Sequence, residues 1–324
     1  MRFSLVPLTA LCALGCDGHG QVGVVGSSTT DDPTETSSTT TDDSYTQTFT
    51  DCALPAPETY SEIALEYPGE EFSFDSEGNF VTAVDWADTI ARMTRDGVWD
   101  FVVPYQSDEL AGIDIMLNGD LVIADEANGV IARVSPEGGT SILDGSILSP
   151  NSIAVSPQDI IYTTAFDELY RIDPETLDKD LLARYPGRDL DGLAFSPDFK
   201  FLWFNQDDRG DIYRMELDEE GFEVETVFVV DFNLQFNTEI DGMTTDACGN
   251  LYVVRTDGKI SRYLHDGTKQ HDFIRIPGAQ YASAIHFGSG LGGWERDHLY
   301  MMDRFGTLFD IPVGIPGAME PHLE

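Results

Sequence analysis

Basic residues are scarce in this chain. Lys and Arg together number 18, against 58 Asp and Glu, which gives a formal net charge of −40 at pH 7. A surface this acidic repels phosphate groups, so the composition argues against nucleic acids and anionic lipid headgroups as partners. The same charge attracts divalent cations, although most acidic side chains in such a chain simply face solvent.

Several signatures of catalysis are absent as well. The sequence contains no Gly-x-Ser-x-Gly elbow, no His-Glu-x-x-His pair and no glycine-rich phosphate loop, which disfavours serine-hydrolase and nucleotide chemistry. Sustained helical periodicity is also lacking. From about residue 60, short apolar runs alternate with turns rich in Gly, Asp, Asn and Pro. The folded part is therefore expected to consist of strands.

Cysteine is rare, with 4 residues in the chain. Cys12 and Cys16 belong to the N-terminal segment, which leaves Cys52 and Cys248 for the rest of the protein. The spacing of these two resembles no zinc site. In an oxidising compartment they would be able to form a disulfide, and the sequence leaves open whether they meet.

The N-terminal segment "MRFSLVPLTALCALGC" has one Arg, a short apolar run and small residues before Cys16. This pattern is typical of an export signal, and the run is too short to remain in a bilayer as a spanning helix. "ALGC" is similar to a bacterial lipobox, with Ala13 where Leu is usual. We expect residues 1–15 to be a signal peptide and Cys16 to be lipidated, with a plain secretory signal as the alternative.

Residues 27–51 consist mainly of Ser, Thr and acidic residues, and they offer almost nothing to bury. We expect residues 16–52 to form a disordered, self-repelling tether between the lipid anchor and a folded domain over residues 53–324. The protein would then lie in the cell envelope of a bacterium or outside the cell. Its contact with the membrane would be made only through Cys16.

A hairpin that occurs six times organises the folded part. Each copy is an apolar strand, a turn of Ser, Pro, Asp, Asn or Gly, and a second apolar strand, followed by a third short strand. The hairpins read FSFDSEGNFVTAVD, IDIMLNGDLVIAD, IAVSPQDIIYTTA, LAFSPDFKFLWFN, MTTDACGNLYVVR and AIHFGSGLGGWERDHLYMMD. Copies spaced about 40–50 residues apart are typical of the four-stranded blades of a β-propeller.

The sequence therefore predicts an all-β fold, a six-bladed β-propeller of four-stranded antiparallel blades. The early strand "SEIALEY" at 61–67 has no blade of its own. We expect this N-terminal strand to supply the outer strand of the last blade and so to close the ring. A β-sandwich is the main alternative, but it does not account for six equivalent hairpins. We expect the protein to be a monomer.

Aligning the hairpin turns identifies one position on each innermost strand. The turn residues taken as equivalent are Asp75, Leu117, Ser156, Ser196, Asp246 and Gly288. The residues five positions earlier are Glu70, Gly112, Asn151, Asp191, Asp241 and Ser283. Because the inner strands of a propeller line its central channel, these six strand heads are expected to converge on the axis at one face.

Three of the strand heads are carboxylates and a fourth is an amide. Packing carboxylates around a narrow axis is unfavourable without a counter-charge. Ca²⁺ would supply one, because it binds carboxylate and amide oxygens together with water. No His stands at these positions, so Ca²⁺ is expected ahead of Mg²⁺ or Zn²⁺. The alternative is that Asp and Asn at strand entries only cap backbone amides.

Over about residues 60–315 the chain resembles the gluconolactonase family, which includes senescence marker protein. "EEFSFD" at 70–75 is similar to the family's Glu-Gly-Pro-x-Trp-Asp segment. "SPNSIAVSP" at 149–157 resembles its Pro-Asn segment, and "DGMTTDACGNLYV" at 241–253 is similar to its Asp-Gly-x-x-x-Asp segment. The resemblance implies a six-bladed propeller with a divalent metal on its axis.

On this resemblance, Glu70, Asn151 and Asp241 match the family's metal ligands. Asp191 stands where the family usually has Asn, and its extra negative charge is expected to hold a cation more tightly while making it a weaker Lewis acid. Ser149 replaces an Arg that sugar-lactonase members carry. This replacement argues against an aldonolactone substrate, but it leaves other lactones and esters open.

These observations lead to two functional hypotheses. The first is a metal-dependent hydrolase of small-molecule lactones or related esters, in which Glu70, Asn151, Asp191 and Asp241 hold the metal and Asp241, or alternatively Asp191, is the catalytic base. Substrate contacts are expected from Glu168, His286 and Arg304. The second is a non-catalytic binding module with a structural Ca²⁺ or no metal.

Overall fold

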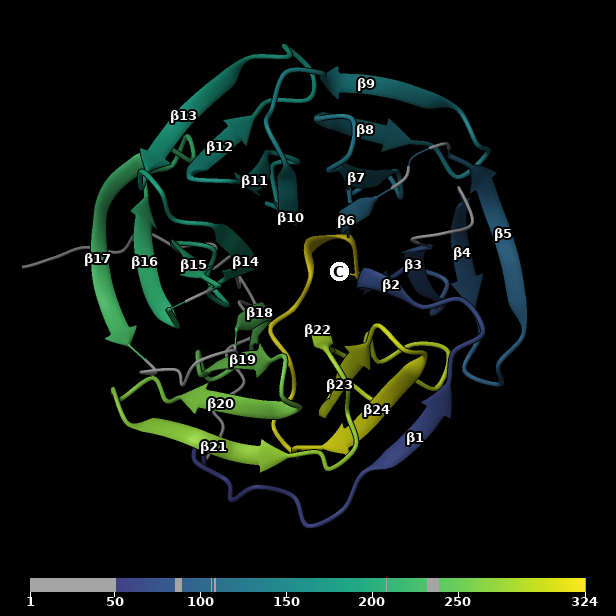
Figure 1. Cartoon of the computed structure of the whole chain (residues 1–324), viewed down its shortest axis with the longest axis vertical. Helices are drawn as coiled ribbons and strands as arrows, with labels where there is room; N and C mark the ends of the chain where they lie inside the picture. Colours follow the sequence, from purple (N-terminus) through teal and green to yellow (C-terminus); the bar gives the residue numbers. More distant parts are fainter. Residues whose placement is uncertain are drawn as a thin grey trace, which may run out of the picture. The chain divides into compact units, whose positions relative to one another are not determined.

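The computed structural model describes residues 51–323 apart from 85–88, 106, 108, 208 and 232–238. The predicted signal peptide, Cys16 and nearly all of the predicted tether lie outside the described residues. Within the described range, six four-stranded antiparallel sheets stand around a central axis as the blades of a propeller (Figure 1). The predicted fold class is confirmed.

In five blades the first strand lies nearest the axis and the fourth lies at the outer edge; in the sixth, β22 (Ala282–Phe287) lies nearest the axis and β1 (Ser61–Ala64) at the outer edge (Figure 1). In chain order the strands are β1 (Ser61–Ala64), β2 (Gly69–Phe74), β3 (Phe80–Val84), β4 (Thr89–Met93), β5 (Trp99–Pro104), β6 (Leu110–Ile115), β7 (Leu121–Asp125), β8 (Val130–Val134), β9 (Thr140–Asp144), β10 (Pro150–Val155), β11 (Ile161–Ala165), β12 (Glu168–Ile172), β13 (Lys179–Arg184), β14 (Leu190–Phe195), β15 (Phe201–Gln206), β16 (Asp211–Leu217), β17 (Glu223–Asp231), β18 (Ile240–Thr245), β19 (Leu251–Arg255), β20 (Lys259–Tyr263), β21 (Lys269–Arg275), β22 (Ala282–Phe287), β23 (His298–Asp303) and β24 (Thr307–Pro312), followed by the 3-10 helix η1 (Pro321–Leu323).

The last blade combines the two ends of the propeller. β1 pairs antiparallel with β24, in a register that runs from Ser61 opposite Asp310 to Ala64 opposite Thr307. The N-terminal strand is therefore the outer strand of the blade formed by β22, β23 and β24, as the sequence predicts. This pairing covers the edge of β24 and joins the first described strand to the last.

Neighbouring blades pack through apolar side chains. The strands β3, β7, β11 and β19 are buried along their whole length, because the adjacent blades cover both of their faces. Val81 and Ala83 of β3, for example, share a core cluster with Ile113 of β6 and Ile123 of β7. Burial on both faces explains why these strands read as nearly continuous apolar runs.

The C-terminal segment after β24 folds back to the centre of the propeller (Figure 1). It contacts the ends of inner strands that lead into hairpin turns. Ala318 N donates a hydrogen bond to Thr245 O at 3.0 Å, and His322 Nε2 lies 2.7 Å from Phe74 O. This segment therefore closes the end of the channel at which the hairpin turns lie.

A disulfide fastens the start of the described chain to the same end of the molecule. Cys52 and Cys248 are bonded with a Cα–Cα distance of 5.7 Å, and 196 residues separate them in sequence. Cys248 lies in the hairpin turn between β18 and β19, and Asn250 Nδ2 in that turn donates to Cys52 O at 2.8 Å. Within the described residues, no helix is long and apolar enough to cross a membrane.

Candidate metal centre

The head of every inner strand contains a β-bulge. The antiparallel register shifts after the first residue of β2, β6, β10, β14, β18 and β22. The second residue of each strand lies inside the bulge. These residues are Glu70, Ala111, Asn151, Asp191, Asp241 and Ser283. A bulge turns a side chain out of the regular pleat, so the second residues of the six inner strands share one bulged position at the same end of the channel.

This set corrects one predicted position. In blade two the equivalent residue is Ala111 and not Gly112. The turn bond from Met116 N to Asp120 O, at 2.9 Å, matches the one from Asp75 N to Asn79 O, also 2.9 Å. The turn of blade two therefore begins at Met116, whereas the sequence alignment placed it at Leu117. Met116 is apolar and reads as a continuation of the strand, which explains the shift by one residue.

The bulged heads of neighbouring strands lie in close contact. A Cβ on Gly192 would lie 2.5 Å from Asp241 O, and a Cβ on Gly242 would lie 2.7 Å from Ser283 O. Both distances are too short for any side chain larger than hydrogen. The glycine that follows Asp191 and Asp241 is thus required by the close approach of the adjacent strand, which accounts for the two Asp-Gly pairs of the sequence.

Side chains from neighbouring strands hold the backbone of the acidic heads. Ser283 Oγ donates a hydrogen bond to Glu70 O at 2.7 Å, and Asn205 Nδ2 donates to Asp241 O at 2.8 Å. Thr164 Oγ1 does the same for the backbone carbonyl of Asp191, at 2.6 Å. With their carbonyl groups engaged in this way, the three acidic residues are fixed at the backbone.

Most of the predicted ligand side chains have no protein partner. Among the residues that the structure describes, the side chains of Asn151, Asp191 and Asp241 take part in no hydrogen bond or ion pair. The Oδ1 atom of Asn205 is fully buried and also lacks a hydrogen-bond partner within the described range. Buried oxygen atoms normally find a donor or a cation. Asn151, Asp191 and Asp241 are partly exposed, so water or a cation would be able to satisfy their oxygens, whereas Asn205 Oδ1 is closed off from solvent.

The surroundings of Asp191 and Asp241 disfavour the charged form of both side chains. Burial raises the pKa of Asp191 well above its usual range, and the charge of Glu70 raises it further. Burial likewise raises the pKa of Asp241, to which the charges of Asp191 and Glu70 add. Their mutual effects show that these three carboxylates share one region of low dielectric, where like charges repel strongly.

Arg304 supplies positive charge at this end of the channel. Its Nη2 atom lies 2.8 Å from Glu70 Oε2, and its charge opposes the rise in the pKa of Asp241. The backbone N–H of Arg304 donates to Tyr281 O at 3.2 Å, and the guanidinium lies 5.6 Å from the centroid of the Tyr281 ring. Of the predicted substrate-binding residues, Arg304 is the one that contacts a predicted ligand.

The other two predicted substrate-binding residues lie elsewhere. Glu168 stands on the third strand of its blade, where it accepts a hydrogen bond from Tyr170 and lies 3.5 Å from Arg184 Nε. His286 lies further down β22, with its Nε2 atom 3.0 Å from Glu71 Oε1. Burial opposes protonation of His286, but the hydrogen bond to Glu71 and the negative charges of Glu71, Glu320 and Asp114 together raise the pKa.

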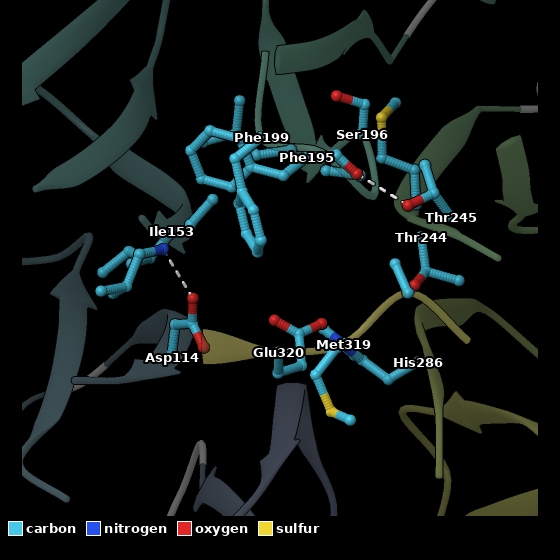
Figure 2. A pocket seen from close by; sticks show the side chains of 16 residues that line it. Asp114, Ile153, Phe195, Ser196, Phe199, Thr244, Thr245, His286, Met319 and Glu320 are labelled. Carbon is cyan, nitrogen blue, oxygen red and sulfur yellow. Dashed lines mark hydrogen bonds between the residues drawn. The ribbon is translucent and has the colours of Figure 1, made fainter. Parts of the chain in front are cut away.

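His286 also lines a cavity of about 40 Å³ at the hairpin-turn end of the channel (Figure 2). Asp114 and Glu320 point into this cavity, with Phe195 and Phe199 opposite (Figure 2). Burial raises the pKa of Asp114 to about 8, and the charge of Glu320 adds to the rise. Neither acid was predicted. Asp114 has a sequence signal, a single carboxylate inside an apolar run, whereas Glu320 lies beyond the last repeat and has none.

No three His, Cys, Asp or Glu side chains within the described residues are arranged as a ready metal cluster. The four predicted ligands do occupy the same bulged position of their strands: Glu70, Asn151, Asp191 and Asp241. The fold and this site together define a class of protein, a six-bladed β-propeller with acidic and amide side chains at the axial heads of its inner strands.

A family model matches part of the chain. Residues 163–303, less than half of the chain, match the model of the SMP-30/gluconolactonase/LRE-like region. The matched range includes Asp191 and Asp241, while Glu70, Asn151 and Arg304 lie outside it. No curated protein sequence matches the chain.

Several solved structures have the same fold. A gluconolactonase from Xanthomonas campestris is 18% identical, with 81% of this chain and 91% of that chain covered and a TM-score of 0.64. The calcium-binding protein regucalcin from Agrobacterium tumefaciens is 17% identical, with 82% and 98% covered and a TM-score of 0.63. A luciferin-regenerating enzyme is 15% identical, with 81% and 98% covered and a TM-score of 0.66. Identities this low show the fold alone.

Proposed function

We propose that the protein is a metal-dependent hydrolase of lactones or related esters. The observation that carries this proposal is the set of unpartnered oxygens at the axial strand heads. Within the described residues, the side chains of Asn151, Asp191 and Asp241 have no protein partner. Two of these side chains are carboxylates that repel each other, and a cation is the ligand that would satisfy them.

The donor set fits a hard divalent cation. Glu70, Asn151, Asp191 and Asp241 would hold it, and all four offer oxygen, so Ca²⁺ is favoured over Mg²⁺ and Zn²⁺. The buried Oδ1 atom of Asn205 would gain a nearby positive charge. When bound, such a cation would polarise the carbonyl group of a lactone or ester and stabilise the oxyanion that develops on it.

The chain's own groups supply the remaining chemistry. Asp241, or alternatively Asp191, would accept a proton from the attacking water, because each carboxylate lies at the axis with no protein donor competing for it among the described residues. The hydrogen bond from Asn205 Nδ2 to Asp241 O fixes the backbone of that base. Arg304 and Tyr281 lie beside Glu70 and Asp241, where they would orient a bound substrate.

The closed end of the channel supports entry of substrate from the strand-head end. The C-terminal segment crosses the opposite end. In this proposal, the protein is exported, Cys16 carries a lipid, and the acidic tether holds a monomeric propeller away from the membrane so that small molecules reach the axial site.

A second function, a non-catalytic binding module, is favoured by one contact. Glu70 is already neutralised in part by Arg304 at 2.8 Å, so the site would be able to persist without a catalytic metal.

A screen of aliphatic lactones and aryl esters with Ca²⁺, and with a chelator, distinguishes the hydrolase from the binding module. The hydrolase proposal expects Ca²⁺-dependent turnover that Asp241→Asn abolishes. Absence of turnover from a protein that binds Ca²⁺ stoichiometrically would leave the binding module.

A further inference from the structure

Arg304 connects the two blades between which the propeller closes. It follows β23 in blade six, and its guanidinium reaches Glu70 on β2 of blade one. The Glu70 side chain is 13% exposed and the Arg304 side chain 26% exposed. An ion pair that is this far removed from solvent is screened less than one on the surface, so its charges act strongly on neighbouring groups.

The position of the guanidinium is fixed by its surroundings. The backbone N–H of Arg304 donates to Tyr281 O, and the guanidinium lies beside the Tyr281 ring. Tyr281 itself has a left-handed backbone with φ 56°, a conformation that the surrounding structure must hold. The charge of Arg304 also acts on Glu126 and Asp241. The Arg304 guanidinium is thus a fixed positive charge at the strand-head end of the channel.

A divalent cation and this guanidinium make competing demands on the same carboxylate. Any metal that uses Glu70 must share that carboxylate with an ion pair already formed through Oε2 at 2.8 Å. It must also bind close to a positive charge, and at such distances like charges repel by amounts that change affinity by about tenfold or more. Both effects weaken metal binding relative to the same donor set without Arg304.

We propose that Arg304 is a tethered counter-ion of the axial site, which neutralises Glu70 in the metal-free protein and lowers the affinity of the site for the metal. The inference rests on the proposed function only for the location of the metal site. It assigns Arg304 a positioning role toward Glu70 and makes the metal-free propeller a stable state of the protein.

The test is calorimetric titration of the full chain with Ca²⁺. Arg304→Gln is expected to bind Ca²⁺ about tenfold more tightly than the wild type, and Arg304→Lys, which keeps the charge, is expected to stay close to the wild type. Arg184→Gln is the matched control, because it removes the same charge from a side chain that is 59% exposed and pairs with Asp167 and Glu168. A gain in affinity cannot be produced by misfolding.

Thermal melting in a chelator provides the second readout. Removing the counter-ion is expected to lower the melting temperature of metal-free Arg304→Gln below that of Arg184→Gln, and added Ca²⁺ is expected to reverse the order. Unchanged or weaker Ca²⁺ binding by Arg304→Gln would overturn the inference and leave the proposed metal site standing. Binding by Arg304→Gln alone would support the inference. Absence of binding by every variant would reject the metal site and the inference together.

Discussion

Both ends of the central channel contain carboxylates, but the two ends differ in whether protein groups donate hydrogen bonds to these carboxylates. At the hairpin-turn end, Asp114 accepts hydrogen bonds from Ile115 N and Val155 N, both at 2.7 Å, and the chain's own C-terminal segment covers it. At the strand-head end, Asp191 and Asp241 have no donor within the described residues. The protein itself therefore supplies donors to the acid at one end, and this difference is the basis for proposing a cation at the other.

The largest expected effect comes from exchanging one acid at each end for its amide. Asp241→Asn removes a ligand charge and the proposed base, so we expect Ca²⁺-dependent hydrolysis to fall by at least about a hundredfold. Asp114→Asn has the same charge change at the other end. It is expected to retain activity within about twofold, because within the described residues the Asp114 side chain accepts its hydrogen bonds from Ile115 N and Val155 N and not from the axial site. Initial rates on a hydrolysed ester measure both. Equal losses of hydrolytic activity in the two variants would contradict the claim that only the strand-head end carries the catalytic site.

Removal of the disulfide is expected to have the next largest effect. Cys52–Cys248 closes a loop across 196 residues, and native disulfides of this kind contribute about 2–5 kcal/mol. Cys52→Ser with Cys248→Ser is therefore expected to lower the melting temperature by several degrees without changing Ca²⁺ affinity, because the bond lies at the hairpin-turn end. Differential scanning calorimetry gives the first quantity and titration the second. A large loss of Ca²⁺ binding would show that the two ends are coupled.

A pH dependence sharpens the comparison further. The pKa of Asp114 is raised from 3.8 to about 8 in the folded protein. A carboxyl group whose folded pKa is raised favours folding while it is protonated, and that contribution is lost as pH rises from about 4 toward 8. Asp114→Asn keeps one acceptor oxygen for two N–H donors, a loss that is the same at every pH. The stability of the variant relative to the wild type is therefore expected to increase by a few degrees of melting temperature between pH 4 and pH 8.

Melting curves of wild type and variant across this pH range test the sign of the effect. A difference in melting temperature that stays constant or moves against the variant from pH 4 to pH 8 would show that the pKa of Asp114 is not raised, contrary to its position beside Glu320.

The smallest expected effect belongs to the C-terminal segment. Glu320→Gln removes the charge that adds to the rise in the pKa of Asp114, so we expect a slight stabilisation near neutral pH and no change in Ca²⁺ affinity. Titration and melting of this variant beside Glu70→Gln compare one acid from each end. A weaker Ca²⁺ affinity in Glu320→Gln would place the cation at the hairpin-turn end, opposite to the proposed site.

The fold was accessible from the sequence because the repeat is regular. Six hairpins with polar turns predict six blades, and the strand at 61–67 has no blade to join except the last. The strand-head positions could be predicted for the same reason, because each lies five residues before the start of its hairpin turn. The one shifted position, Gly112, arose where the turn begins with the apolar residue Met116 and the periodic signal is weakest.

What the sequence could not show lies outside the repeat or between distant blades. Glu320 belongs to the segment after the last blade, whose path back to the axis is fixed by contacts with Thr245 and Phe74 and by no pattern. The pairing of Arg304 with Glu70 depends on the closure of the ring. Contacts of this kind depend on tertiary packing, so spacing along the chain carries no signal for them.

The central claim is that the strand-head end of the channel is completed by a divalent cation. Titration of the full-length wild type with Ca²⁺ beside Asp241→Asn and Asp114→Asn tests it most directly. We predict stoichiometric binding by the wild type and by Asp114→Asn, and loss of binding by Asp241→Asn. Retention of binding by Asp241→Asn, or its loss in Asp114→Asn, would contradict the claim.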